Sequence, residues 1–139
     1  SGLRNNHAAY TKTQATNLAM DMAERIRANP NGRANYVGFD TSGTIPSEPV
    51  CISSGCTPTQ LADYDKFEWS IPILGKNASI TAPTKPVLPA GQGLVTKNGD
   101  EFIVTILWRK IAYDGMIRNS CNQAGLANDM ACFQLSFKP

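Results

Sequence analysis

The chain has 139 residues, of which 42% are hydrophobic and 17% are charged, and its formal net charge is +2 at pH 7. This composition excludes an intrinsically disordered chain and fits one domain with its own core. A net charge this small gives no electrostatic reason to expect nucleic acid or acidic lipid as a partner. No apolar run approaches the roughly 20 residues that a membrane-spanning helix requires.

The first predicted element is a long helix over residues 3–29. Its apolar residues recur at spacings of three and four, which places them on one stripe of a helix. Asp21 and Arg25 stand four residues apart, which favours the same helical register. An Asn-Pro-Asn-Gly turn at 29–32 predicts the end of the helix. The stripe consists of Ala8, Ala15, Leu18, Ala19, Met22, Ala23 and Ile26.

A loop-rich connection over 31–57 follows the helix, and we expect Tyr36, Val37 and Phe39 to fix it to the core. A second, shorter helix is predicted over 58–71. Its start carries the residues of a capping box, since Thr57 can cap the helix and Gln60 can reach back to it. We expect Pro72 to end or bend this helix, and Trp69 to lie at the boundary of its apolar side.

The C-terminal third predicts an antiparallel sheet. Strands at 94–96 and 101–109 flank Asn98-Gly99, a dipeptide suited to a type I′ hairpin turn. The second strand is apolar on both faces near its middle, so it is predicted to be central and covered on one side by the long helix. Residues 110–117 are a possible continuation of the sheet. Strict alternation over 133–137 predicts an antiparallel partner for 101–109.

Four cysteines form two pairs that are close in sequence: Cys51 with Cys56, and Cys121 with Cys132. Three pairings are possible, and the nearest-neighbour pairing is our prediction. A zinc site is the competing interpretation, but neither pair has the usual two-residue spacing of zinc ligands. Disulfides indicate an exported, oxidising location.

Several sequence stretches resemble the PilV-type minor pilins of type IV pili. They are QATNLA at 14–19, DMAERIRANP at 21–30, DYD at 63–65 with EW at 68–69, and VTILWR at 104–109. The resemblance implies an α+β fold, the type IV pilin-like head, in which a long N-terminal helix packs on an antiparallel sheet and a short second helix lies in the connecting loop. The sequence departs from the family at Ile71-Pro72-Ile73, which places the end of the second helix earlier than the family pattern does.

The same resemblance implies a division of one domain, 1–139. Residues 3–29 would be the C-terminal half of a spine helix, 30–92 a connecting region containing the helix at 58–71, and 93–139 the sheet with a disulfide-closed loop. A preceding apolar segment, cleaved and N-methylated by a prepilin peptidase, would anchor the protein in the inner membrane with its head in the periplasm. The head would become extracellular after assembly into the pilus.

The implied function is that of a minor pilin, which primes pilus assembly by contacts with other minor pilins and the major pilin and can remain at the tip. A minor pseudopilin of a type II secretion system is the alternative within the same architecture. An adhesive or DNA-binding tip module is the alternative of a different class. The sequence contains no catalytic motif, so we expect no enzyme, no cofactor, no metal and no small-molecule substrate.

Individual polar residues have simple interpretations. His7 is expected to be an exposed helical histidine. The acidic group Asp63, Asp65 and Glu68 is interpreted as a solvated helix face, because these residues point to different sides of a helix. The basic group Arg25, Arg27 and Arg33 is the candidate for DNA binding, which the small net charge disfavours.

We predict that the functional surface is the helix itself. The residues assigned to an assembly interface are Leu3, Ala8, Tyr10 and Ala15. The residues assigned to the core between helix and sheet are Leu18, Met22, Ile26, Val104, Ile106 and Trp108.

Overall fold

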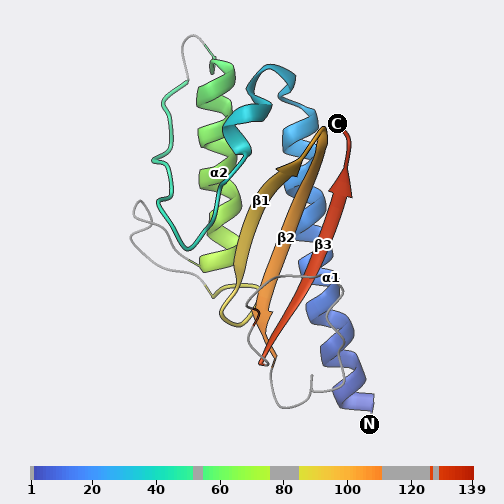
Figure 1. Ribbon diagram of the computed structural model, residues 1–139. Coiled ribbons are helices and arrows are strands. Elements are labelled where there is room, and N and C mark those ends of the chain that lie inside the picture. The colour runs from blue at the N-terminus through green and yellow to red at the C-terminus, as the bar shows by residue number, and fades with distance from the viewer. Residues whose placement is uncertain (1, 52–54, 76–84, 111–125, 127–128) are drawn as a thin grey trace.

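The computed structural model describes residues 2–51, 55–75, 85–110, 126 and 129–139, and of residues 2–6 and Ala8 it describes the backbone alone. The elements are α1 (Gly2–Arg27), the 3-10 helix η1 (Pro30–Tyr36), α2 (Pro58–Leu74), β1 (Gln92–Asn98), β2 (Glu101–Arg109) and β3 (Met130–Phe137). The strands form an antiparallel sheet in the order β1-β2-β3, and α1 runs along it (Figure 1). The predicted α+β fold is therefore confirmed.

The register of the sheet defines one core face. Residues that pair across neighbouring strands share a face, and Val104 lies between Val95 of β1 and Leu135 of β3. On this face Val95, Val104 and Ile106 are fully buried against α1. The six residues assigned to the helix–sheet core all lie in this buried cluster: Leu18, Met22, Ile26, Val104, Ile106 and Trp108.

The turn between β1 and β2 differs from the prediction by one residue. Asn98 pairs with Glu101, so the two-residue loop is Gly99-Asp100 and not Asn98-Gly99. Gly99 has φ +64°, and no positive φ occurs at Asp100. Positive φ at the first loop position alone is the pattern of a type II′ turn, which requires glycine only there.

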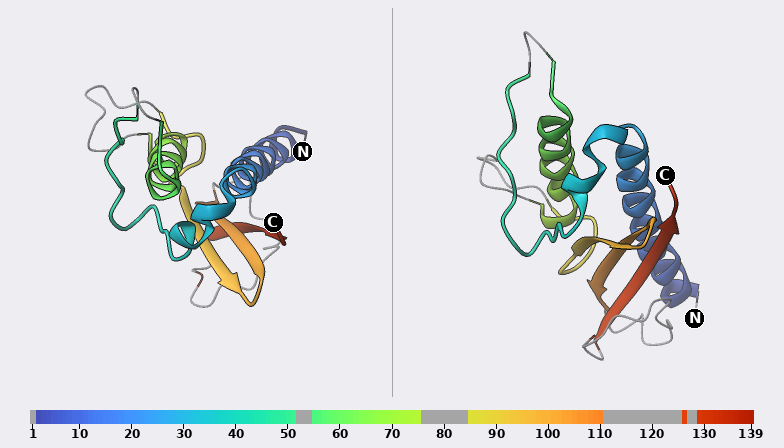
Figure 2. Two further views of the ribbon diagram at one scale, coloured as in Figure 1. Left: turned by 90° about the horizontal axis from the view of Figure 1, so that it is seen from above. Right: turned by 45° about the horizontal axis from the view of Figure 1, so that its top comes forward.

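Helix α2 lies beside α1 on the core face of the sheet (Figure 2). Trp69, predicted at the boundary of the helix, is fully buried, and its Nε1 donates a hydrogen bond of 2.8 Å to the Leu18 carbonyl oxygen of α1. The indole ring lies over Gly93 of β1, where an added Cβ would come within 2.7 Å of the ring atom Cζ3. Glycine at 93 thus permits the close approach of α2 to the sheet.

Both ends of α2 are defined by caps. The Thr57–Gln60 capping box is present, with bonds of 3.2 and 2.9 Å. The predicted end before Pro72 is wrong, because the helix continues to Leu74. Pro72 lies in the last turn, and that turn is held by buried Ile73 and by Gly75, which donates to the Ile71 carbonyl at 2.7 Å. Helix α1, in turn, ends at Arg27, two residues before the predicted end.

The connection after α1 begins with η1 and then runs along the outer edge of β1. Gly38 N–H donates to Val95 O at 2.8 Å, and Val95 N–H donates to Phe39 O at 2.9 Å. Tyr36 and Phe39 are buried as expected, whereas Val37 is 41% exposed and does not contribute to the core. Tyr36 before it and Phe39 two residues after it point inward, whereas Val37 faces solvent.

The cysteine prediction is confirmed for Cys51–Cys56, which form a disulfide. Cys132 is also disulfide-bonded, and its expected partner Cys121 lies outside the described residues, as does the predicted sheet continuation over 111–117. Among the described residues no group of His, Cys, Asp and Glu is arranged to hold a metal ion. Strand β3 begins at Met130, three residues before the predicted 133.

Candidate assembly surface

The two halves of α1 differ in their contacts. From Thr11 onward the helix is buried along one stripe, and Thr11 itself is 1% exposed. The preceding turns extend past the end of the sheet (Figure 1), and Tyr10 is 55% exposed there. Among the side chains of α1 that the structure describes, Tyr10 is therefore the most exposed large hydrophobic one.

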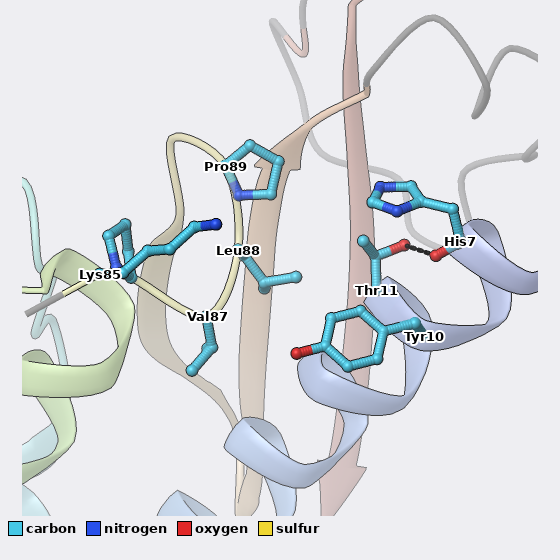
Figure 3. Close-up of a pocket in the computed structure, with 8 residues that line it drawn as sticks. His7, Tyr10, Thr11, Lys85, Val87, Leu88 and Pro89 are labelled. Atoms are coloured by element: carbon cyan, nitrogen blue, oxygen red, sulfur yellow. Dashed lines mark hydrogen bonds between the residues drawn. The ribbon is translucent and has the colours of Figure 1, made fainter.

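An open groove separates these first turns from the segment 85–89 (Figure 3). It has a volume of about 500 Å³ and is lined from α1 by His7, Tyr10 and Thr11, and from the opposite side by residues 85–89. Figure 3 shows the Tyr10 ring directed toward Val87 and Leu88. Leu88 is buried and forms part of the core, so this wall of the groove is fixed.

The chemistry of the groove is apolar with a basic rim. Val87, Leu88 and two prolines supply its apolar wall, and Lys85 and His7 are its basic side chains. The described lining residues include no acidic side chain. An apolar or acidic side chain of a protein partner would be complementary to these lining residues.

A buried polar cluster fixes the other end of α1. Arg25 donates to Asp65 of α2 at 2.9 Å and to Asp21 of α1 at 3.0 Å. The Tyr36 hydroxyl donates to the second carboxylate oxygen of Asp65 and accepts from Asn29 Nδ2 at 3.2 Å. The Asp65 carboxylate thus joins α1, η1 and α2. This joint lies in the interior, since Asp65 is only 5% exposed.

The electrostatics of this cluster favour its paired form. Burial alone would lower the pKa of Arg25, but the hydrogen bond that Arg25 donates to Asp65 and the charge of Asp21 outweigh burial, and the pKa of Arg25 is raised. Burial raises the pKa of Tyr36, and its hydrogen bond to Asp65 raises it further. At neutral pH Arg25 is therefore charged and the Tyr36 hydroxyl is protonated, as both hydrogen bonds require.

The interpretation of Asp65 as part of a solvated face is wrong. Asp63 and Glu68 are partly exposed, and Asp63 pairs with Lys66 at 3.3 Å. Asp65 instead lies with Ala62 and Trp69 on the buried side of α2. Its spacing of three and four from those residues is the signal that could have identified it.

The predicted interface residues fall into three groups. Tyr10 is exposed and lines the groove. Ala15 is fully buried in the core, so its assignment to an exposed interface is wrong; the apolar stripe that includes it faces the sheet. The side chains of Leu3 and Ala8 lie outside the described part of the structure. His7, expected to be exposed, is half-buried in the groove.

The basic residues considered for DNA binding do not form a common patch. Arg25 is bound by two aspartates. Arg27 pairs with Glu24 at 2.5 Å and lies 4.8 Å from the centroid of the Phe137 ring. Arg33 Nε donates to the Ile26 carbonyl at 3.5 Å. Each guanidinium thus has an intramolecular partner, and the three point to different neighbours.

Comparison with known protein families gives a match to the N-terminal part of the chain. Residues 2–67 match the family model described as "Tt1218-like: Type IV pilin Tt1218", which covers just under half of the chain. No curated protein and no solved structure shows a significant match. In the described part of the chain, no helix has the length and apolar character needed to span a membrane. The matched segment contains α1, η1 and most of α2, the elements that the buried cluster joins, and with the α+β fold this match supports a type IV pilin.

Proposed function

We propose that this protein is a minor pilin that takes part in priming type IV pilus assembly and acts through protein–protein contacts alone. The observation that carries the proposal is the exposed Tyr10 side of α1 with its groove. Its partners would be other minor pilins and the major pilin. Before assembly the head would lie in the periplasm, held at the inner membrane by the segment that the family resemblance implies.

The rigidity of α1 supports this role. The Asp65 cluster and the Trp69–Leu18 hydrogen bond fix the helix against α2 and the sheet. A surface that is already ordered loses little conformational entropy when a partner binds. The Tyr10 side of α1 is therefore presented in a fixed orientation, as a subunit that starts an ordered assembly requires.

The proposal is tested in the host organism with the full-length gene. Tyr10→Glu places a charge in the groove without affecting the core, since Tyr10 is 55% exposed. We expect surface pili and twitching motility to fall by about tenfold, as expected when a central aromatic contact of an interface is lost. The matched control is Val50→Glu, which alters an 86% exposed apolar residue on the connection before α2.

Two results would contradict the proposal. Normal piliation with Tyr10→Glu would exclude the groove as an assembly surface. Normal piliation after deletion of the whole gene, with type II secretion lost, would instead identify a minor pseudopilin. Equal thermal stability of the Tyr10→Glu and unaltered chains ensures that a loss of pili reports on assembly and not on folding.

A further inference from the structure

The groove beside α1 has a wall that is fixed at two points. Residues 85–89 form this wall, and the Val87 N–H donates to the Pro72 carbonyl oxygen of α2 at 3.0 Å. The Pro89 carbonyl oxygen accepts from the Arg109 N–H of β2 at 2.8 Å. The wall is therefore held to both α2 and the sheet, and it faces α1 across the groove (Figure 3).

Two polar groups in the groove have no partner within the described part of the chain. Lys85 is exposed and makes no ion pair there. The Tyr10 hydroxyl likewise makes no hydrogen bond to any described residue. In Figure 3 the Lys85 side chain extends from the wall toward α1, and the Tyr10 hydroxyl is directed from α1 toward the wall. An ammonium and a hydroxyl placed on opposite sides are donors suited to one carboxylate.

The charges around the groove also favour an anion. Its basic side chains are Lys85 and His7, and no acidic side chain is among its described lining residues. Arg109 is exposed beside the wall, and its guanidinium makes no ion pair within the described residues. A carboxylate in the groove therefore meets a positive potential. The apolar wall removes water from the contact and so strengthens it.

The position of the groove limits which part of a partner can reach it. This step rests on the proposed function, in which each pilin is held at one membrane by the segment before its long helix, so that neighbouring helices run parallel. The first turns of α1 form one side of the groove and lie at the N-terminal end of the molecule (Figure 1). The corresponding turns of a neighbour's long helix therefore come next to the groove.

A second copy of this chain does not fit the groove in that arrangement. Its first 20 residues contain no aspartate or glutamate. Their basic residues are Arg4, His7 and Lys12. A copy at the same height would place these like charges against Lys85. Its first carboxylate, that of Asp21, lies about three helical turns after Tyr10 and is already bonded to Arg25 at 3.0 Å.

We propose that the groove binds a carboxylate on the long helix of a different pilin, and that it selects this partner over a second copy of the chain. Lys85 and Tyr10 donate to the carboxylate from opposite sides of the groove. An apolar residue three or four positions away shares the same face of the partner helix and packs on Val87. A helix with a basic residue in place of the carboxylate is repelled, which gives the groove its specificity.

Photocrosslinking in the host identifies the occupant. The full-length protein is made with p-benzoylphenylalanine in place of Tyr10, whose ring is 55% exposed and outside the core. We expect a crosslink to the long helix of another pilin, within one helical turn of an aspartate or glutamate. A crosslink to a second copy of the chain would overturn the proposal, and so would one to a helix without a carboxylate at that level.

A charge exchange then tests the carboxylate itself. Lys85→Glu should lower the number of surface pili by about tenfold or more, because it places two carboxylates against each other. Replacing the identified carboxylate of the partner by lysine should restore piliation in the Lys85→Glu strain. The matched control is Lys138→Glu, which reverses the charge of an exposed lysine after β3 and should leave piliation unchanged.

The outcomes separate this inference from the proposed function. Normal piliation with Lys85→Glu, together with reduced piliation for Tyr10→Glu, would overturn the carboxylate site and leave the proposed function in place. An exchange that fails to restore piliation would overturn the site as well. Normal piliation with both variants would refute the proposed function itself. Lys85 is exposed, so equal thermal stability of Lys85→Glu and the unaltered chain shows that the loss reports on assembly.

Discussion

The buried Asp65 cluster offers the sharpest test of how the fold is held together. In the variant Asp65→Asn the side chain keeps its shape and loses its charge. It can no longer accept from both Arg25 and Tyr36 as a carboxylate does, and its amide group faces another donor. Removing one member of a buried ion pair costs about 3–5 kcal/mol.

Two features of the structure lower the expected cost of Asp65→Asn below that range. The Arg25 side chain is 25% exposed, and it retains Asp21 at 3.0 Å after the substitution. The Tyr36 hydroxyl also keeps its contact with Asn29 at 3.2 Å. We therefore expect the free energy of unfolding to fall by about 2–3 kcal/mol. For a chain of this length that corresponds to a Tm lower by roughly 5–10 °C.

The assay is urea unfolding followed by tryptophan fluorescence, since Trp69 and Trp108 are both buried. The matched control is Asp63→Asn on the same helix, where the carboxylate is 40% exposed and the expected change is within about 0.5 kcal/mol. Combining Asp65→Asn with Tyr36→Phe should give less than the sum of the single effects. Equal costs for the Asp65 and Asp63 variants would refute the assignment of Asp65 as the joint between the helices.

Three further predictions concern Tyr36, Gly93 and the cap of α2. The pKa of Tyr36 is raised in the folded state, so above about pH 10 the folded protein binds more protons than the unfolded chain. The free energy of unfolding therefore falls as pH rises, by up to about 1.4 kcal/mol per pH unit. Measured from pH 9 to 11, the free energy of unfolding of Tyr36→Phe should fall less steeply with pH. Gly93→Ala should lower the free energy of unfolding by about 2–3 kcal/mol, because its Cβ would overlap the Trp69 ring. The control is Gly43→Ala, whose Cβ would have only an ordinary contact of 3.4 Å and should change the urea midpoint little. Thr57→Ala removes the cap of α2 and should cost about 1 kcal/mol in the same assay; an unchanged midpoint would mean that the capping box does not hold that end of the helix.

Helices and strands with one buried face could be predicted from the sequence, because burial of one face makes their apolar residues recur at a regular spacing. The spacing of Leu18, Met22 and Ile26 predicted the buried face of α1, and the apolar character of both faces of 101–109 predicted the central strand. The Thr57–Gln60 capping box identified the start of α2 to the residue. In each case the interactions that determine the structure are local in sequence.

Features that depend on contacts between segments distant in sequence could not be predicted. The burial of Asp65 depends on Arg25 and Tyr36, which lie 40 and 29 residues away. Ala15 was assigned to an interface because a stripe of small apolar residues fits either a sheet or a neighbouring helix, and only the position of the sheet decides between them. The same applies to the continuation of α2 through Pro72, which depends on the burial of Ile73 in the core.

The covering of β1 by residues 38–41 also limits how far such molecules can associate. A sheet with two uncovered edge strands can gain further strands at both edges without limit, which is the geometry of fibrillar aggregation. Here the edge at β1 is occupied by the chain's own connection, which bonds to Gly93 and Val95. A strand of another molecule therefore cannot extend the sheet at this edge, and a segment of only four residues provides that protection.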